Sequence, residues 1–310
     1  MPELPEVETI RAGLAKLLPG KVVKDVWYDW DKSFPNAPAD VARFLVSSKI
    51  EKVRRRAKVL IIELSGGWAL IIHLKMTGQL VCTGSAGKLS AKSFKLKAEE
   101  KFGGGHPSKS LIGNLPDKST RVIIDFQDGS KLFFNDQRKF GWMRLMPAIE
   151  IPEIDFFKKV GPEPLDDDFT VDKFIERLMR RKNSNIKAVL LDQTVVAGIG
   201  NIYADEALWG AKIHPSALVG NVPKTKLVLL YNSLRDVLNL SIQKGGSTDK
   251  NYVDAQGKKG SYLAFANVFR REGQPCPRCG TPIEKIRVAG RGTHICPHCQ
   301  KPPLLPRTKT

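Results

Sequence analysis

Long hydrophobic runs are missing from this 310-residue sequence. The apolar stretches Val59–Ile62 and Trp68–Ile72 have the length of β-strands, far below the roughly 20 residues that a membrane-spanning helix needs. The first residues include Glu3, Glu6 and Glu8 and contain neither a basic segment nor an apolar core, which argues against a secretory signal. The sequence therefore predicts no membrane association and no export.

Cysteine is also scarce, and its arrangement is informative. Of five cysteines, four form the close pairs Cys276-x-x-Cys279 and Cys296-x-x-Cys299, which sixteen residues separate. This is the spacing of a four-cysteine zinc site in a reducing compartment, and it does not favour a disulfide framework. The intervening residues can form a hairpin, and the metal would supply much of the folding free energy of this region. Cys82 stands alone and is predicted to be a small core residue.

Acidic residues are few relative to basic ones. The chain has 32 Asp and Glu against 50 Lys and Arg, a net charge of +18 and a pI near 9.7. A surplus of this size favours a polyanionic partner, because each neutralised phosphate releases condensed counterions. A merely soluble basic protein would have the same composition, so charge alone indicates nucleic acid without proving it. The length predicts two domains with an additional small module.

The first residues carry the pattern of a helix. Pro5 suits the first helical position, and Glu6 and Glu8 lie in the first turn, where the helix dipole favours acids. Helical spacing then places one apolar set on a single face: Val7, Ile10, Leu14 and Leu17. We therefore expect an N-terminal helix.

From about residue 22 to 145 the pattern changes to strands separated by turn residues, which predicts a β-sandwich or β-barrel. The expected strands include Val59–Leu64, Trp68–Leu74, Arg121–Phe126 and Lys131–Phe134. Residues 83–118 interrupt this pattern with seven lysines, three acids and six glycines. We expect a long basic surface loop there, which either helps to hold DNA or is a solvated insertion.

The second half of the chain carries helical patterns. A Pro- and acid-rich run at 148–165 is interpreted as a linker between a domain of residues 1–147 and a helical domain of residues 166–269. Cys-rich residues 270–310 form the zinc module and tail. The expected helices are Val171–Met179, Ile186–Val196, Ile202–Trp209 and Lys224–Gln243. Glycines before Asn201 would leave backbone amides exposed at a helix start, which suits a phosphate.

Several short motifs occur in a recognisable order. They are Pro2–Thr9, Arg55–Lys58, His73–Gly78, Asn135–Gly141, Gly161–Leu165, Leu191–Gln193, Gly198–Glu206 and Ala289–Thr293 beside the zinc cysteines. Together they resemble the formamidopyrimidine-DNA glycosylase family, whose sister family is endonuclease VIII. The matches span nearly the whole chain except residues 83–118.

The resemblance implies an α+β fold of several parts. We expect an N-terminal helix with a β-sandwich, a helical domain with a helix–two-turn–helix motif, and a zinc finger holding one Zn²⁺. It also implies a monomeric base excision repair enzyme of the bacterial cytoplasm and nucleoid, acting on double-stranded DNA with oxidised bases or abasic sites. Leu4 favours the branch that excises oxidised purines, such as 8-oxoguanine and formamidopyrimidines.

Catalytic roles follow from the resemblance, residue by residue. Pro2, N-terminal once Met1 is removed, would be the nucleophile that forms a Schiff base with the sugar. Glu3 would be the acid and base for base loss and ring opening, and Glu6 would support it. Lys58 would serve β-elimination, and Arg291 would clamp a phosphate for δ-elimination. By position alone, Glu3 and Glu6 are better explained as simple helix-start acids.

DNA contacts follow in the same way. A base in the duplex is out of reach, so the family flips it out and fills the gap with a triad. The matching residues are Met76, Arg138 and Phe140. Asn201 would hold a phosphate, and His73 is a further expected DNA contact. Lys187 is expected to contact DNA because it lies close to the basic residues Arg180, Arg181 and Lys182, before the glycines that precede Asn201. Taken singly, Met76 and Phe140 would more often be core residues.

Two alternatives remain open from sequence. One is an endonuclease VIII-like enzyme for oxidised pyrimidines, and the other is a catalytically silent zinc DNA-binding protein. The latter would need none of Pro2, Glu3 and Lys58. Lesion recognition in the family uses a loop that corresponds to residues 245–258, and the following Lys259–Tyr262 departs from the family pattern. This departure leaves the exact lesion preference undetermined.

Overall fold

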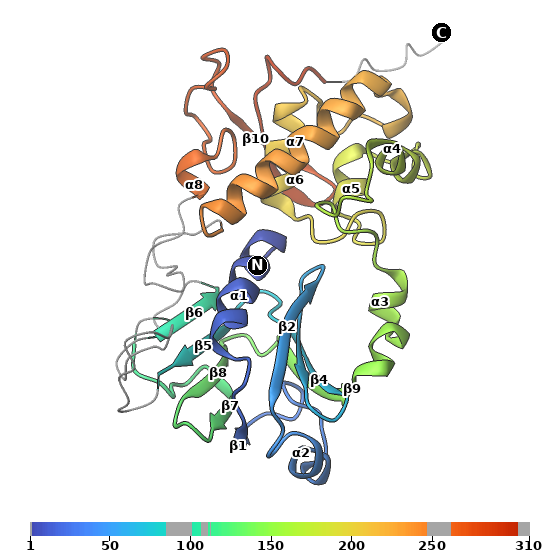
Figure 1. The fold of residues 1–310 in the computed structure, drawn as a ribbon. Coiled ribbons are helices and arrows are strands. Elements are labelled where there is room, and N and C mark those ends of the chain that lie inside the picture. The colour runs from blue at the N-terminus through green and yellow to red at the C-terminus, as the bar shows by residue number, and fades with distance from the viewer. Residues whose placement is uncertain (1, 85–100, 107–110, 112, 247–261, 303–310) are drawn as a thin grey trace. The chain divides into compact units, whose positions relative to one another are not determined.

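The structure is a computed structural model that describes residues 2–84, 101–106, 111, 113–246 and 262–302 (Figure 1). The chain divides into two compact units. The first comprises residues 1–158 and 242–261, and the second comprises residues 159–241 and 262–310. Within the described part of the chain, no helix combines the length and the apolar character needed to cross a membrane.

The first unit contains two antiparallel sheets. One has five strands in the order β1-β7-β8-β5-β6, and the other has four in the order β2-β3-β4-β9. The five-stranded sheet consists of β1 (Val23–Tyr28), β5 (Gly78–Thr83), β6 (Lys101–Gly105), β7 (Thr120–Phe126) and β8 (Lys131–Asp136). The four-stranded sheet consists of β2 (Ile50–Arg56), β3 (Val59–Leu64), β4 (Trp68–His73) and β9 (Trp142–Pro147). The four expected strands are present. β3 has the expected ends, and each of the other three differs from the expectation at one end by one or two residues.

Both sheets contribute alternate side chains to one core, which confirms the β-sandwich. Leu60 and Ile62 from β3 and Leu80 and Phe134 from the other sheet lie in the same buried cluster. The opposite face of β3 is also covered, so this strand is buried on both sides and is apolar without alternation. Cys82 is 1% exposed in the main core, as predicted.

Helix α1 (Leu4–Leu17) packs its apolar face against this core. Its first helical residue is Leu4, so Pro5 occupies the second position and not the expected first one. A short helix, α2 (Pro38–Phe44), follows β1. Because Val7, Ile10 and Leu14 are almost fully buried, the start of α1 is attached to the sandwich.

The expectation of an unstructured basic loop at 83–118 is wrong for part of the segment. Residues Lys101–Gly105 form edge strand β6, which pairs with β5. The Phe102 side chain is fully buried in the main core. Gly105 has φ +125°, and a Cβ there would lie 2.3 Å from the Gly78 carbonyl oxygen. The glycine run therefore reflects close backbone approach along a sheet edge and not a solvated loop. Residues 85–100, 107–110 and 112 lie outside the described residues.

The expected linker at 148–165 contains short helical elements. The 3₁₀ helix η2 (Ala148–Glu153) and α3 (Asp155–Lys159) follow β9. Ile151 and Phe156 pack on the outer face of the four-stranded sheet, and the division between the two units falls after Lys158.

The second unit is helical. Its elements are α4 (Val171–Met179), α5 (Ile186–Leu191), α6 (Asn201–Gly210), the 3₁₀ helix η3 (Val219–Asn221), α7 (Lys224–Gln243), and α8 (Tyr262–Phe265). Helix α5 ends five residues before its predicted end, because the Asp192 carboxylate accepts bonds from the Thr194 backbone N–H and hydroxyl at 2.9 and 2.7 Å. Such a local turn competes with helical hydrogen bonding.

A two-stranded hairpin completes this unit. It consists of β10 (Glu284–Val288) and β11 (Arg291–Ile295), with Val288 opposite Arg291. Ala289 and Gly290 form the two-residue turn with φ values of +50° and +73°. The hairpin lies between the two cysteine pairs, as the sequence predicted.

Candidate functional site

The start of α1 is a reciprocal cap made of two buried acids. The Glu3 backbone N–H donates to the Glu6 carboxylate at 2.8 Å, while the Glu3 carboxylate accepts from the Glu6 backbone. The Glu3 and Glu6 side chains are only 4% and 5% exposed, and Pro2 is buried beside them. The acids are helix-start residues, but they are held in a buried and defined position. Acids that only complement the helix dipole would remain exposed to solvent, whereas Glu3 and Glu6 are buried.

The root of the expected lesion-recognition loop lies against the same cap. Gly246 has φ +91°, and a Cβ there would be 3.2 Å from Glu6 Cγ. A larger residue would therefore meet the side chain that caps Glu3. Residues 247–261, which include most of the expected loop and Lys259, lie outside the described residues.

Lys58 lies in the two-residue turn that joins β2 and β3. The preceding Ala57 has φ +52°, and the Lys58 side chain is only 6% exposed. Arg55 connects this turn to α1, since it donates to Glu8 Oε2 at 3.0 Å and to the Ala57 carbonyl at 2.8 Å. Lys58 is therefore neither a strand residue nor exposed to solvent.

His73 ends β4 and is held as a neutral imidazole. Burial, with Lys75 and Lys58 adding positive charge nearby, lowers the pKa of His73 from 6.5 to about 3. Its Nδ1 accepts the Lys75 backbone N–H at 3.0 Å, and its ring lies 5.9 Å from that of Trp142. With Nδ1 accepting, the proton of the neutral ring is on Nε2, which is a donor suited to a phosphate oxygen.

Met76, Arg138 and Phe140 come together at the surface. Arg138 Nη1 lies 3.3 Å from Met76 Sδ, and the Arg138 guanidinium lies 4.8 Å from the centre of the Phe140 ring. Met76 and Phe140 are 43% and 53% exposed, so the core interpretation of these two residues is wrong. Two apolar side chains flanking an arginine are consistent with the expected wedge.

The loops that carry the wedge residues are joined by Asp136, which was not among the residues predicted from the sequence. This carboxylate is fully buried and accepts bonds from the Thr77 hydroxyl, from the Arg138 N–H at 3.2 Å and from the Gly141 N–H at 2.6 Å. It therefore joins the loop that carries Met76 to the loop that carries Arg138. Its position inside the Asn135–Gly141 motif was the only signal in the sequence.

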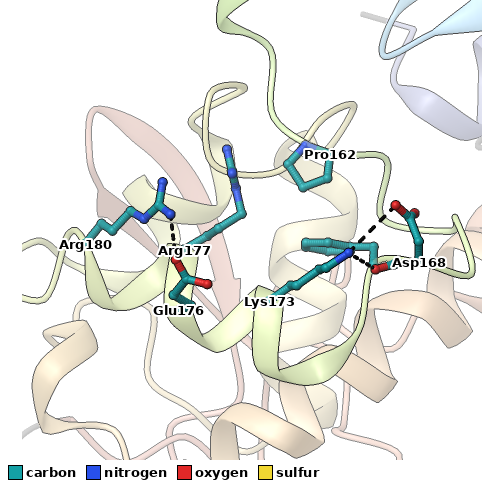
Figure 2. Close-up of a pocket in the computed structure, with 7 residues that line it drawn as sticks. Pro162, Asp168, Lys173, Glu176, Arg177 and Arg180 are labelled. Carbon is teal, nitrogen blue, oxygen red and sulfur yellow. Dashed lines mark hydrogen bonds and ion pairs between the residues drawn. The ribbon is translucent and has the colours of Figure 1, made fainter.

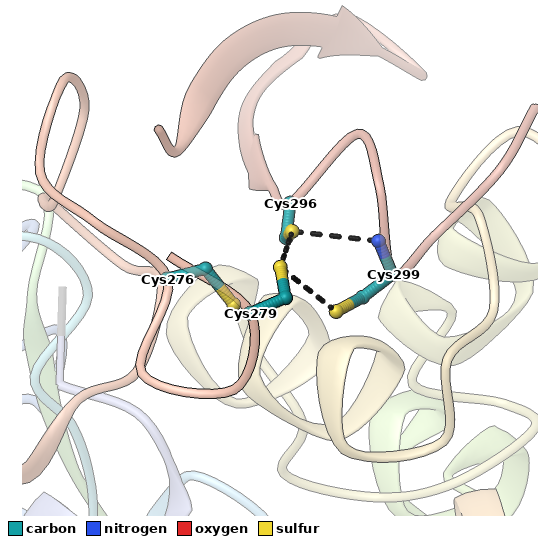
Figure 3. Close-up of side chains that lie close together, drawn as sticks. All are labelled: Cys276, Cys279, Cys296 and Cys299. Carbon is teal, nitrogen blue, oxygen red and sulfur yellow. Dashed lines mark hydrogen bonds between the residues drawn. The ribbon is translucent and has the colours of Figure 1, made fainter. Parts of the chain in front are cut away.

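The four paired cysteines converge in the second unit (Figure 3). Their Sγ atoms lie within 4.8 Å of one another, with Cys279 at 3.4 Å from Cys296 and 3.6 Å from Cys299. Tetrahedral Zn–S bonds of about 2.3 Å require S···S separations of about 3.8 Å, so the geometry suits zinc. The Trp209 indole N–H donates to Cys276 Sγ at 3.4 Å. Four thiolates would complete the tetrahedral coordination of one zinc ion, which leaves no position for a reactive water.

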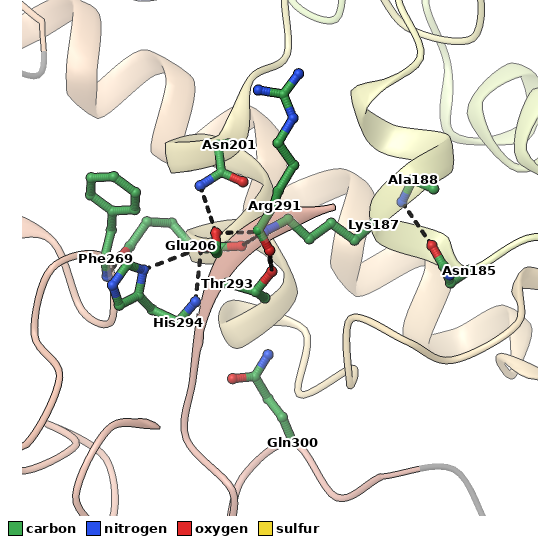
Figure 4. A network of polar contacts seen from close by, with 12 residues as sticks. Asn185, Lys187, Ala188, Asn201, Glu206, Phe269, Arg291, Thr293, His294 and Gln300 are labelled. Carbon is green, nitrogen blue, oxygen red and sulfur yellow. Dashed lines mark hydrogen bonds and ion pairs between the residues drawn. The ribbon is translucent and has the colours of Figure 1, made fainter. Parts of the chain in front are cut away.

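The hairpin that carries Arg291 is joined to α6 (Figure 4). Arg291 begins β11 and is exposed, and its side chain extends away from the polar network. Asn201, the first residue of α6, donates to the Gly292 carbonyl at 3.0 Å. The structure therefore brings together two residues that the sequence analysis placed in separate motifs.

Lys187 requires a correction. Its side chain is 0% exposed and donates to Asp205 Oδ1 and to Thr293 Oγ1, each at 2.6 Å. A fully buried ammonium that is already bonded cannot reach a phosphate, so the expected DNA contact is wrong. Lys187 follows the basic residues Arg180, Arg181 and Lys182 in the sequence, but its position on α5 turns it toward the interior.

A surface hollow of about 140 Å³ lies elsewhere, along α4 (Figure 2). Lys173, Arg177 and Arg180 line it together with Asp168 and Glu176. The charges largely pair, since Arg180 contacts Glu176 at 2.6 Å and Lys173 lies 3.8 Å from Asp168. It includes none of the expected site residues and is not part of the candidate site.

Comparison with known proteins identifies three consecutive matches. The model of the formamidopyrimidine-DNA glycosylase N-terminal domain matches residues 1–143, and that of the family's H2TH domain matches residues 160–252. A zinc finger model found in the same proteins and in isoleucyl-tRNA synthetases matches residues 273–302. With the geometry of the four cysteines, this match assigns one structural zinc ion to the chain.

Relatives that match over nearly the whole chain belong to the same family as the domain matches. The chain is 40% identical over 300 residues to formamidopyrimidine-DNA glycosylase from Pediococcus pentosaceus, covering 97% of this chain and 99% of the relative. It is also similar to two solved structures of the Lactococcus lactis enzyme, one with abasic-site DNA and one of a mutant with Fapy-dG-containing DNA. Each has a TM-score of 0.81 and 32% identity, and covers 97% of this chain and 100% of that chain. From the fold, the zinc cluster and these matches, the chain belongs to the formamidopyrimidine-DNA glycosylase family.

Proposed function

We propose that this protein excises oxidised purines, such as 8-oxoguanine and formamidopyrimidines, from double-stranded DNA and then cleaves the strand. The observation that carries the proposal is the burial of Pro2, Glu3, Glu6 and Lys58 within one unit. Glutamate and lysine are rarely this buried, and a group of buried ionisable residues in one part of a fold is typical of a catalytic site. A silent DNA-binding protein would have no use for them.

Pro2 is the proposed nucleophile. After removal of Met1, its secondary amine has an α-amino pKa of roughly 8 and is partly neutral near pH 7. The nitrogen lone pair attacks the sugar C1′, and the C1′–N bond to the damaged base breaks, with its electron pair leaving on the base. The nitrogen then loses its proton, and the C1′–O4′ bond breaks with its electron pair leaving on the ring oxygen, which takes up a proton. The iminium that results accepts electrons and permits elimination of the 3′ and then the 5′ phosphate.

The other groups divide the proton transfers and the charge stabilisation. Glu3 moves protons during base loss and ring opening, and Glu6 holds Glu3 in place through the reciprocal cap. Lys58 serves β-elimination, and Arg291 binds the phosphate that departs in δ-elimination. The zinc ion is structural, because it stabilises the hairpin that carries Arg291.

Base flipping uses the wedge of Met76, Arg138 and Phe140. The two exposed apolar side chains replace lost stacking, and the guanidinium hydrogen-bonds the orphaned base. The neutral His73 and the helix-start residue Asn201 contact backbone phosphates. A net charge of +18 strengthens this binding at low salt. We place this activity in the bacterial cytoplasm and nucleoid, with the protein acting as a monomer.

The test is borohydride trapping on a duplex that contains 8-oxoguanine opposite cytosine. Reduction converts the iminium to a stable amine, so the native protein should form a covalent adduct that peptide mapping places on Pro2. The Pro2→Gly variant should give far less adduct, since its primary amine is differently placed. An adduct on a lysine, or binding to abasic-site DNA without incision, would contradict the proposal.

A parallel duplex with thymine glycol tests the substrate class. Preference for 8-oxoguanine is expected. If the pyrimidine lesion is cleaved faster, the protein acts as an endonuclease VIII-like enzyme, and the assignment to oxidised purines is wrong.

A further inference from the structure

A buried polar relay lies directly behind Arg291 (Figure 4). Asp205 on α6 accepts from Lys187 on α5 at 2.6 Å, and Lys187 donates to the Thr293 hydroxyl at 2.6 Å. That hydroxyl in turn donates to the Arg291 carbonyl at 3.0 Å. The relay therefore runs from two helices to the backbone of Arg291.

The relay is inaccessible to water. Lys187, Asp205 and Thr293 are all 0% exposed. An ion pair at such a position contributes little net stability relative to apolar residues of the same size, because desolvation offsets most of the attraction. Its geometry is nevertheless well defined, since each hydrogen bond is short and has no competing water.

Other bonds from the same elements hold the next residues of β11. The second Asp205 oxygen accepts the His294 backbone N–H at 3.0 Å. Lys187 and Asn201 both donate to the Gly292 carbonyl, at 3.4 and 3.0 Å. The backbone of Gly292 and of His294 is thus bonded to residues of α5 and α6, whereas the Arg291 side chain itself is exposed.

We propose that Lys187 and Thr293 are positioning residues for Arg291, and that through it they determine how far strand cleavage proceeds from β- to δ-elimination. This inference rests on the proposed function of Arg291. Without the relay, the guanidinium of an exposed arginine at a hairpin turn would sample many positions. To clamp a phosphate, the guanidinium has to be held in one position. The relay reduces this freedom at the backbone, where the side chain begins.

The sharpest variant is Thr293→Val. It has nearly the same shape, leaves the Lys187–Asp205 pair intact and removes only the hydroxyl that joins Lys187 to Arg291. Thr293→Ser keeps the hydroxyl and serves as the conservative variant. Thr225→Val makes the same change at an exposed position of α7 and is the matched control.

The measurement uses zinc-loaded protein and a duplex with an abasic site. Thr293→Val should lower the ratio of β,δ product to β product about fivefold, the effect of one hydrogen bond. Borohydride trapping and zinc content should stay at the native level, and Thr293→Ser and Thr225→Val should behave like the native protein. An unchanged ratio in Thr293→Val would overturn the proposal, as would an equal loss of trapping.

A double variant tests whether the effect passes through Arg291. In protein that already carries Arg291→Ala, adding Thr293→Val should change the ratio no further, because the group being positioned is gone. A further loss would mean that Thr293 acts on something else. If Thr293→Val loses zinc, the joint variant Lys187→Met with Asp205→Asn removes both buried charges together and should lower the ratio similarly; an unchanged ratio in zinc-loaded protein overturns the proposal.

A readout without catalysis separates this inference from the proposed function. Amide hydrogen exchange in the hairpin segment 289–295 should be faster in Thr293→Val than in the native protein. If native protein forms no trapped adduct, the proposed chemistry is wrong, while faster exchange still supports the relay. If exchange is unchanged, the relay does not hold Arg291, whatever the activity.

Discussion

The Glu6 carboxylate accepts the backbone N–H of Glu3 at 2.8 Å, so the proposed acid and base is held by the residue three positions later. Glu6→Ala removes this acceptor and should lower the free energy of unfolding by about 1 kcal/mol. Excision of 8-oxoguanine should slow about tenfold, equivalent to ~1.4 kcal/mol on the barrier, because Glu3 loses its fixed position.

The control for this prediction is Glu6→Gln, which keeps an acceptor oxygen and should stay close to native in stability. Thermal unfolding and single-turnover excision measure the two effects. Equal excision by Glu6→Ala and native protein would show that the cap has no part in positioning Glu3.

The wedge predicts a difference between substrates. Arg138→Ala removes the group that contacts both Met76 and Phe140, so excision of 8-oxoguanine from a paired duplex should fall at least about tenfold, consistent with the cost of unstacking a base. Cleavage of an abasic site needs no extrusion of a base and should change little. The measurement compares the rates of 8-oxoguanine excision and of abasic-site cleavage for native protein and Arg138→Ala under the same conditions. An equal loss of both rates would contradict the wedge assignment.

Zinc removal should act through the hairpin. The four cysteines surround a site with little apolar core around it, so extraction of the metal should unfold the segment that carries Arg291. We expect a chelator to abolish strand incision and to weaken DNA binding, and added zinc to restore both. Gel assays with measured metal content test this expectation, and full activity in metal-free protein would refute the structural role.

His73 predicts a loss of stability in acid. In the folded state its pKa is lowered to about 3, whereas the unfolded chain has a value near 6.5. Below pH 6.5 the unfolded state therefore binds a proton that the folded state does not. The contribution of the neutral His73 to the free energy of unfolding is therefore fully present above pH 6.5. As the pH falls from 6.5 toward 3, this contribution declines by up to ~1.4 kcal/mol for each pH unit.

The comparison for this prediction is His73→Asn, whose amide oxygen can accept the Lys75 N–H in place of Nδ1. Urea unfolding at pH 7 and pH 5 should show a steeper decline for native protein than for the variant. Parallel declines would mean that His73 titrates normally in the folded protein.

The contact between positions 13 and 102 predicts that the effect of Gly13→Ala on stability changes sign when Phe102 is removed. A Cβ at Gly13 would lie 2.1 Å from the Phe102 ring, so Gly13→Ala should destabilise the protein although alanine favours a helix by about 1 kcal/mol. Phe102→Ala alone should cost about 3–5 kcal/mol because it leaves a cavity. In the Phe102→Ala background the added methyl has room, and Gly13→Ala should become stabilising. Chemical denaturation of the four proteins tests the coupling, and purely additive effects would show that Gly13 and Phe102 are not in contact.

Much of this protein follows from local sequence. A short apolar run bounded by turn residues predicted β3 without error, and the helical period predicted α4 and α7 to the residue. The spacing of Cys276, Cys279, Cys296 and Cys299 predicted the metal cluster, since two short knuckles bring four sulfurs to one ion wherever they occur. The family motifs supplied the remaining candidate residues.

Other features depended on contacts between distant residues. Strand β6 has a sequence of low strand propensity and exists because β5 offers an open edge and the core accepts Phe102. In the sequence, Asp136 is only one residue of a motif. Its role follows from the structure, where its carboxylate accepts hydrogen bonds from both Thr77 and Gly141.

Lys187 shows the difference between what local sequence predicts and what contacts between distant residues determine. Its charge and basic neighbours are local facts, and they predicted a phosphate contact. Its burial against Asp205 and Thr293 depends on residues 18 and 106 positions away. The sequence alone determined which residues could take part in the chemistry and where the metal binds, because both depend on residue type and short spacing. Only the tertiary structure decided which charged groups face solvent and which are paired inside, because burial is set by packing between segments far apart in the chain.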